Sequence, residues 1–599
     1  MAESRAMKRP IRLALPLVLA FLAMTVADPA LPQGARNAPP AASRPNLAVI
    51  ISVDGLNWGR LAGYRPYFTG GLKRLLDEGW VEQEARYRHI NTETAPGHAS
   101  LGTGAPPRVT GIVANLWFAP KADGTLGGVY CTDQVLIDAG SGERTVFPGP
   151  ANMRVPTLGD RLVEASPSSR VVAISGKDRG SIFLAGKNRA HAVYWFDNDT
   201  GRFVSSAAYD AKAPNGAAVA SLVARYNRKR AGGHLPGRFG LTWKKLETPV
   251  PPVPDDTARP VPTADLALYQ LPAVGLGWDH DLPRYPSGYF GGIFYSPFVD
   301  ELVADVAVEL LADRALGLGR RDAPDLLCLS FSGQDTVSHN YGPESEENFD
   351  LLRRLDVQLG RVFRELERDL PGARIVVAFS SDHGFTPIPE AARKRDAATK
   401  GGRVDAGTYR FTTFVDRLNR GVSEELCLAM NARPVHGIDG YNLKYDVPKL
   451  PLMPTMTGTC GPAGRIVGPA ELDRVLPGVV RRFFSEEFSD VLLASQKEAW
   501  DPRDPAVEFA RNSFDADRSG DAILIPREGV VMGWDPARGT THGSHFEGDI
   551  HVPLIFWGSG IPKKVSAVPS TPYDLALTLG ALLGIKLPDA VGRPLLPAR

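Results

Sequence analysis

The sequence predicts an α/β fold with a mostly parallel central sheet flanked by helices on both faces. Four short aliphatic runs are typical of strands buried on both faces of such a sheet, and they cover residues 46–53, 171–175, 326–331 and 374–381. Residues 298–316 and 346–370 carry apolar side chains three and four positions apart, as helices that cover a sheet do. Strands and helices therefore alternate along the chain, which favours a parallel sheet between two helical layers.

Composition excludes several functional classes. The chain has 599 residues, 68 basic and 67 acidic side chains and a formal charge of +1. Apart from the N-terminus, it contains no long run of Lys or Arg. A balanced charge does not indicate a surface for nucleic acid or anionic lipid, so we expect neither. We expect a globular monomer that acts on small molecules.

The N-terminus resembles an export signal. Arg5, Lys8, Arg9 and Arg12 precede an apolar run at residues 13–27 that ends in small residues. The run is short for a membrane span, so we predict a signal peptide at 1–27, with a retained anchor as the alternative. Residues 28–45, rich in Pro and Ala, are predicted to be a linker. The mature protein would be periplasmic or secreted, without stable membrane association.

The remaining chain, residues 46–599, is predicted to form one catalytic domain. Two stretches, at about 184–295 and 400–525, fit the strand and helix order poorly, and we interpret them as insertions that cap the strand ends. Among four cysteines, Cys328 lies in an apolar strand and is expected to be a buried free thiol, whereas Cys427 and Cys460 could pair.

Thr94 is the candidate nucleophile. It precedes Ala-Pro-Gly at a predicted helix start, where backbone N–H groups and the helix dipole favour an anion. A hydroxyl needs a base or a metal to remove its proton, so the rest of the chain must supply an activator. The alternative is that Thr94 only caps the helix and that the nearby His98 only packs.

Acidic and histidine residues follow the predicted strands. Because the C-terminal ends of parallel strands meet at one edge, we expect these residues to converge. Asp335 and His339 are four positions apart, which places them on one face of a helix. Three carboxylates and three imidazoles are ligand types that zinc ions take up, and the candidates are Asp54, Asp335, His339, Asp382, His383 and His542. Any one of these acidic or histidine motifs, taken alone, would more often be a capped turn than a metal site.

These motifs together resemble the alkaline phosphatase superfamily, specifically its phosphate-irrepressible, PafA-like branch. The resemblance rests on Thr94 before Ala-Pro-Gly-His, Asn115 after Gly-Ile-Val-Ala, Lys177-Asp178-Arg179, the Asp335 and His339 pair, Ser-Asp382-His383-Gly and His542-Gly-Ser. It extends from about residue 46 to residue 599.

The resemblance implies two zinc ions per chain. One would be held by Asp335, His339 and His542, and the other by Asp54, Asp382, His383 and the Thr94 oxygen. Thr94 would carry the phosphoryl group in a covalent intermediate. The predicted substrate-binding residues are Asn115, Lys177, Asp178 and Arg179, of which Asn115, Lys177 and Arg179 would hold the phosphoryl oxygens. A zinc-bound alcohol loses much of its proton affinity, which supplies the required activator.

Three functions compete. The first is a secreted phosphatase for phosphate monoesters, which Lys177 and Arg179 favour because they add positive charge for a dianion. Without the neighbouring motifs, both would be surface charges in a turn, and Asn115 could equally cap a turn. The second function is a nucleotide pyrophosphatase or phosphodiesterase of the same superfamily. The third is a non-catalytic metal- or phosphate-binding protein, which would be expected to lack a ligand or the nucleophile.

Overall fold

The computed structural model describes most of the chain. The described residues are 44–121, 123–137, 144–231, 241–246, 280–283, 285–389, 407–429, 431–446, 467–533 and 540–596. All of them belong to one compact unit that spans residues 39–599. The predicted signal peptide and nearly all of the predicted linker lie outside the described residues. Within the described part of the chain, no helix combines the length and apolarity that a membrane span requires.

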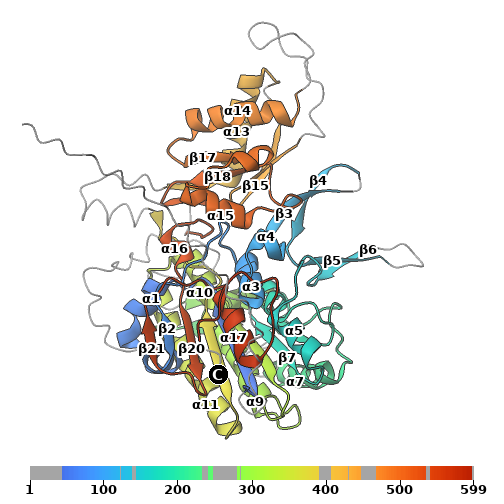
Figure 1. Ribbon diagram of the computed structural model, residues 1–599, viewed down its shortest axis with the longest axis vertical. Coiled ribbons are helices and arrows are strands. Elements are labelled where there is room, and N and C mark those ends of the chain that lie inside the picture. Colours follow the sequence, from blue (N-terminus) through green and yellow to red (C-terminus); the bar gives the residue numbers. More distant parts are fainter. Residues whose placement is uncertain are drawn as a thin grey trace, which may run out of the picture. The chain divides into compact units, whose positions relative to one another are not determined.

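A nine-stranded sheet forms the centre of the fold (Figure 1), and its strand order is β21-β2-β20-β13-β1-β12-β7-β8-β9. Five neighbouring strands run parallel: β13 (Ile375–Ser380), β1 (Leu47–Val53), β12 (Asp325–Phe331), β7 (Val171–Ser175) and β8 (Ala192–Asp197). Antiparallel pairs occur towards the edges, at β20 (Leu554–Gly558), β2 (Trp80–Glu82) and β9 (Arg202–Val204), while β21 (Lys564–Ser566) is parallel to β2. The predicted fold class is confirmed.

Successive side chains of β1 point to opposite faces of the sheet, and a different set of helices covers each face. Leu47, Val49 and Ile51 of β1 pack with α2 (Gly71–Glu78), α7 (Pro214–Ala231), α9 (Phe298–Ala312) and α11 (Glu346–Asp369). Ala48 and Ile50 point the other way, towards α3 (Thr94–Thr103), α5 (Leu158–Ala165), α6 (Asp178–Ala185) and α17 (Asp574–Leu583). Every residue of β1 is buried, because a strand between two helical layers has no solvated face.

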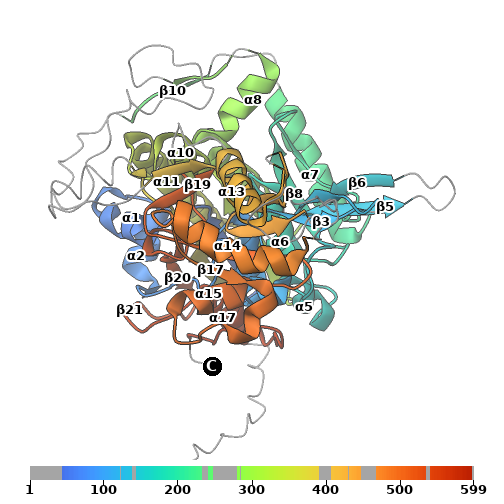
Figure 2. The same cartoon turned by 90° about the horizontal axis from the view of Figure 1, so that it is seen from above.

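The predicted cap insertion at about 400–525 contains a second, four-stranded sheet with its own core. Its order is β15 (Val435–Asp439), β16 (Asn442–Tyr445), β18 (Ala522–Pro526) and β17 (Phe488–Leu493). Helices α13 (Phe411–Leu426) and α14 (Pro469–Phe483) lie side by side in both views (Figures 1 and 2). We call this part of the described chain, residues 407–533, the cap.

The range predicted as the other insertion, about 184–295, includes two strands of the central sheet. Strands β8 and β9 extend that sheet, and β8 is buried along nearly its whole length. Its aromatic residues made it look unlike the aliphatic strands, although aromatic side chains suit a strand equally well. Residues 247–279 lie outside the described residues.

The remaining elements lie in the connections between these layers or within the cap. They are α1 (Trp58–Gly63), η2 (Arg65–Tyr67), α4 (Pro107–Thr110), β3 (Leu116–Pro120), β4 (Leu126–Tyr130), β5 (Asp133–Ile137), β6 (Arg144–Pro148), β10 (Thr242–Trp243), β11 (His280–Asp281), α8 (Pro286–Phe294), α10 (Gly333–Tyr341), β14 (Gly407–Arg410), η5 (Ala494–Ala499), α15 (Pro505–Ser513), β19 (Val530–Gly533) and α16 (Glu547–Ile550).

The cysteines agree with the sequence where they are described. Cys328 is a buried free thiol in β12, as predicted, and Cys131 is another. Cys427 is disulfide-bonded. Its predicted partner, Cys460, lies outside the described residues.

The close approach of α3 to the end of β13 yields a test of the fold. A Cβ added to Gly97 would lie 2.1 Å from the Asp382 carbonyl oxygen, so alanine forces the helix and the strand end apart. We expect Gly97→Ala to lower the free energy of unfolding by about 1–3 kcal/mol, measured by urea denaturation.

Gly63→Ala is the matched control. Gly63 is exposed in α1, and an added Cβ meets nothing within 4 Å. Its unfolding free energy should change by less than about 0.5 kcal/mol. Equal denaturation midpoints for the two variants would contradict the packing of α3 against Asp382.

Candidate metal centre

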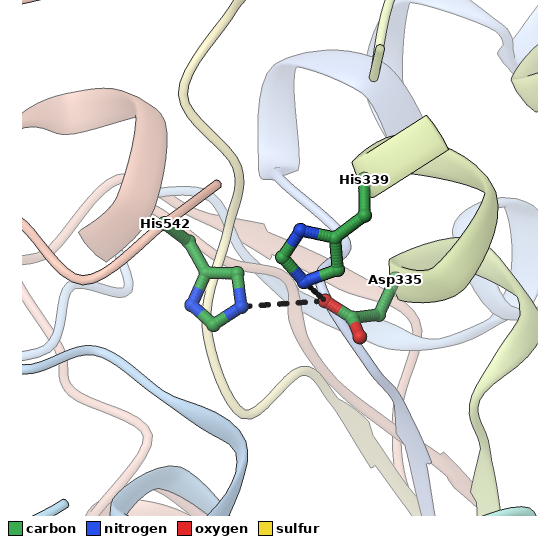
Figure 3. Close-up of side chains that lie close together, drawn as sticks. All are labelled: Asp335, His339 and His542. Carbon is green, nitrogen blue, oxygen red and sulfur yellow. Dashed lines mark ion pairs between the residues drawn. The ribbon is translucent and has the colours of Figure 1, made fainter. Parts of the chain in front are cut away.

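Asp335, His339 and His542 form the first of two clusters. Helix α10 presents Asp335 and His339 on one face, and His542 approaches from the segment before α16 (Figure 3). The Oδ1 atom of Asp335 lies 3.3 Å from His339 Nε2 and 3.4 Å from His542 Nε2. Three potential ligand atoms from two distant parts of the chain thus converge.

Asp54, Asp382 and His383 form the second cluster, and all three are fully buried. Asp54 directly follows β1, and the other two follow the neighbouring strand β13. The Nε2 atom of His383 lies 3.2 Å from Asp54 Oδ1 and 3.6 Å from Asp382 Oδ2. The clusters adjoin, because the rings of His383 and His542 stack with centroids 3.6 Å apart.

The three histidines share one orientation. Each Nδ1 atom lies within hydrogen-bond distance of a backbone carbonyl oxygen: His339 with Thr540 at 3.0 Å, His542 with Thr92 at 2.7 Å and His383 with Gly384 at 2.8 Å. A carbonyl only accepts, so this geometry assigns a proton to Nδ1 and turns each Nε2 towards the carboxylates. Metal-binding histidines are commonly oriented in this way.

Lys177 connects the clusters to Thr94. Its Nζ atom lies 2.6 Å from Asp54 Oδ2, 2.5 Å from Asp335 Oδ2 and 3.4 Å from Thr94 Oγ1. The sequence predicts that Lys177 contacts phosphoryl oxygens, and in the structure its ammonium contacts one carboxylate of each cluster. Carboxylates from both clusters and the candidate nucleophile therefore surround a single cationic group.

Electrostatics at the clusters favours cations. Burial opposes charge on His383, but the negative charges of Asp382 and Asp54 outweigh it and raise the pKa of His383 to about 10. Burial and the positive charge of His383 lower the pKa of His542 to about 3, which keeps its Nε2 unprotonated. Burial also opposes charge on Asp335, yet Lys177 and His339 hold the pKa of its carboxyl well below the usual value.

Thr94 is the first residue of α3 and does not cap the helix. The N-cap position belongs to Glu93, whose side chain makes no capping hydrogen bond. The simple capping role considered for Thr94 is therefore wrong. Asn115 lies beside this helix start, and its Oδ1 accepts from Ala95 N at 2.9 Å.

Arg179 is held by groups that the sequence did not point to. Its Nη1 donates to the Tyr130 hydroxyl at 2.9 Å, and that hydroxyl donates to Asp178 Oδ1 at 3.0 Å. Thr132 donates to the other Asp178 oxygen at 2.7 Å. Both carboxylate oxygens of Asp178, a predicted substrate contact, thus face the β3–β4 hairpin and the turn after it. Nothing in the spacing of Tyr130 from Asp178 and Arg179 along the chain predicts these contacts.

Three further residues at the site escaped the sequence reasoning. His98, predicted only to pack, is buried with Nδ1 at 3.0 Å from Asp382 Oδ2 and Nε2 at 2.9 Å from Ser330 Oγ. Glu93 accepts from Asn115 N at 2.7 Å. Burial and the charge of Glu93 raise the pKa of Asp439 in the cap well above its usual value.

The two clusters fit metal ions. Asp54 Oδ1, Asp335 Oδ1 and His383 Nε2 are buried atoms without a hydrogen-bond partner. Unpaired buried polar atoms are costly, and a cation bound between them would remove that cost. Nitrogen and carboxylate oxygen donors in groups of three suit zinc with an open coordination position.

The family comparison covers most of the sheet and the site. Residues 48–401 match the family described as type I phosphodiesterase / nucleotide pyrophosphatase. The chain is 30% identical over 560 residues to alkaline phosphatase PhoK of Sphingomonas sp., covering 92% of this chain and 90% of the relative. It is 29% identical to alkaline phosphatase PafA of Elizabethkingia meningoseptica over 93% and 94% of the two chains.

A solved structure supports the same relationship. The crystal structure of wild-type alkaline phosphatase PafA superposes with a TM-score of 0.74 at 26% identity. The superposition covers 93% of this chain and 99% of that chain. The resemblance that the sequence motifs suggested is confirmed.

The clusters predict the metal content. We expect purified protein to bind two divalent cations per chain, and His542→Ala to lose one because only Asp335 and His339 remain in its cluster. Lowering the pH should release metal, since protons compete for the carboxylates and imidazoles. Elemental analysis after dialysis at pH 8 and pH 5 measures both effects.

His551→Ala provides the matched control. His551 lies outside both clusters, with Nε2 2.7 Å from the Gln83 carbonyl oxygen. Its removal should leave the metal content unchanged. Two ions retained by the His542 variant would argue against the first cluster as a metal site.

Proposed function

Since this chain belongs to the type I phosphodiesterase / nucleotide pyrophosphatase family, in the PafA-like branch of the alkaline phosphatase superfamily, we propose that it is an alkaline phosphatase. In this proposal it hydrolyses phosphate monoesters through a phosphothreonine intermediate at a two-zinc site. The predicted signal peptide supports a periplasmic or secreted location. The substrates would be small phosphate esters.

The contacts of Lys177 carry the proposal. Thr94 Oγ1, Asp54 Oδ2 and Asp335 Oδ2 all lie within 3.4 Å of one ammonium nitrogen. A hydroxyl at a helix N-terminus therefore lies beside two groups of potential metal ligands. That arrangement meets the requirement for an activated nucleophile next to an anion-binding position.

Each cluster would hold one zinc ion. Asp335, His339 and His542 would bind the first, and the second would be bound by Asp54, Asp382, His383 and the Thr94 oxygen. Bound zinc would lower the pKa of the hydroxyl and stabilise charge on the leaving oxygen. Thr94 Oγ1 forms a bond to phosphorus as the bond to the leaving alcohol breaks, and water later cleaves the phosphothreonine.

The surrounding charges support a monoester substrate. The positive charge of two zinc ions would exceed the negative charge of the three carboxylates. Lys177 and Arg179 add further positive charge to the site. Such a site suits a doubly charged phosphoryl group better than a singly charged one. Asn115 is engaged at Oδ1 by Ala95 N–H, which leaves its amide NH₂ as a donor for a phosphoryl oxygen.

The second candidate is a nucleotide pyrophosphatase or phosphodiesterase, which the description of the matched family favours. It would use the same zinc ligands and Thr94. Lys177 and Arg179 discriminate between the two, because a second ester arm removes the charge that they would neutralise. A non-catalytic binding protein is less well supported, since the nucleophile and all six candidate ligands are present.

Replacing Thr94 tests the proposal. With zinc-loaded protein, we expect hydrolysis of 4-nitrophenyl phosphate to exceed hydrolysis of its bis ester in kcat/KM. Thr94→Ala should lower monoester turnover by at least about a thousandfold, because the attacking oxygen is removed. Acid quenching during turnover, followed by mass spectrometry, should detect phosphate on Thr94 of the wild-type protein. The Thr94→Ala variant should carry no such phosphate.

Thr103→Ala is the control on the same helix. The Thr103 hydroxyl is buried and donates to Ala99 O at 2.7 Å, away from the clusters. This variant should keep its activity. Undiminished hydrolysis by Thr94→Ala would overturn the covalent mechanism, and faster turnover of the bis ester would overturn the monoesterase assignment.

Tyr130→Phe tests how Arg179 is positioned. Loss of the hydroxyl leaves a half-buried guanidinium N–H without its acceptor, so we expect kcat/KM for the monoester to fall about tenfold. The bis ester should be affected less. Tyr445→Phe, which removes a comparable 2.8 Å bond to Asp473 in the cap, should change neither value. Equal losses for both esters would contradict a role of Tyr130 in recognising the dianion.

A further inference from the structure

A cavity lies between the cap and the β3–β4 hairpin. Its volume is about 420 Å³, and its lining comes from β3, β15 and α13. Phe118, Phe411, Val415 and Ile438 supply apolar surface. The ring of His436 meets the ring of Phe118 edge-on, with centroids 4.8 Å apart and planes at 80°. Aromatic rings prefer such edge-to-face contacts, so a further flat ring in the cavity could pack against Phe118 and His436.

The cavity opens on the hairpin face that carries Tyr130. In the β3–β4 pairing, Leu116 is opposite Tyr130 and Phe118 is opposite Gly128, so these side chains share one face. The Tyr130 hydroxyl on that face contacts Arg179. Strand β15 passes over the same face, since a Cβ on Gly437 would lie 3.0 Å from the Phe118 ring.

The other end of β15 reaches the nucleophile segment. Tyr441, in the turn after β15, donates its N–H to Asn91 Oδ1 at 3.1 Å, three residues before Thr94. Phe118 is three residues beyond Asn115, or about 10 Å along a strand. Phe118, which lines the cavity, is thus about 10 Å along the chain from Asn115 of the proposed phosphoryl site.

The charged groups of the cavity are paired. Arg433 lies 3.1 Å from Asp416, and His436 Nδ1 lies 3.7 Å from Asp446. Paired charges around apolar and aromatic surface do not select an ion. The chemistry matches an uncharged planar aromatic group.

We propose that this cavity binds the leaving group of phosphate monoesters that carry a flat aromatic ring system on a short linker. The inference rests on the proposed function and adds a specificity site to it. Alkyl phosphates would not reach Phe118, and their turnover would depend on the phosphoryl contacts alone. A ring stacked in the cavity would add binding energy remote from the reacting atoms, which can raise kcat/KM.

Two substrates test the site, because ribose 5-phosphate and adenosine 5′-monophosphate share the reacting group and differ only in the base. We expect a higher kcat/KM for the nucleotide. Phe118→Ala, which removes the ring contact, should lower the nucleotide value about tenfold. Val415→Trp, which fills the cavity, should act in the same direction. Both variants should leave the ribose 5-phosphate value within about twofold.

Phe483→Ala is the control within the cap. Phe483 is partly buried against the cap core and does not line the cavity. It should leave the ratio of the two kcat/KM values unchanged. Equal losses for both substrates in the cavity variants, or no preference in the unmodified protein, would overturn the cavity as a leaving-group site while leaving the phosphatase intact.

A binding measurement separates the two hypotheses. Calorimetry of both compounds with zinc-loaded Thr94→Ala protein monitors the cavity without turnover. The cavity is supported as a binding site, even if the proposed chemistry fails, when the nucleotide binds more tightly than ribose 5-phosphate and Phe118→Ala removes that difference. Equal affinities for the two compounds would overturn it.

Discussion

Three carboxylates buried at one sheet edge impose the main constraint on this protein. Asp54, Asp335 and Asp382 are almost completely inaccessible to solvent, and charge in such a place is costly without a nearby cation. Lys177 contacts two of them, and the raised pKa of His383 is another response to the same negative field. A fold that keeps these carboxylates charged must supply positive charge, which is the condition for binding divalent metals.

The parallel sheet and the backbone together create this condition. Strands β1 and β13 are neighbours, so Asp54 and Asp382 come together at their ends, while α10 begins shortly after β12 and presents Asp335. Backbone carbonyls of Thr92, Gly384 and Thr540 then fix the three imidazoles. Because the orienting groups belong to the main chain, the geometry depends on the packing of whole segments, including the approach of Gly97 to Asp382.

The hairpin and the cap border this centre. Tyr130 holds Arg179 from one face of the β3–β4 hairpin, and Phe118 on the same face borders a cavity under β15. The turn after β15 touches Asn91, close to Thr94. In the proposed function, phosphoryl recognition and contact with the leaving group would therefore depend on segments outside the sheet, separate from the proposed metal ligands.

The sequence by itself determined the four inner strands, the covering helices and the identities of the residues that gather at the strand ends. Hydrophobic runs and short motifs are local signals, and parallel strands bring their ends together whatever lies between them. Only the tertiary structure placed β8 in the central sheet, turned Asp178 towards Tyr130 and Thr132, and brought His98 to Asp382. These contacts join residues that are far apart in the sequence, or they depend on the direction in which a side chain points. Both are set by the packing of the folded chain and not by the spacing of residues along it.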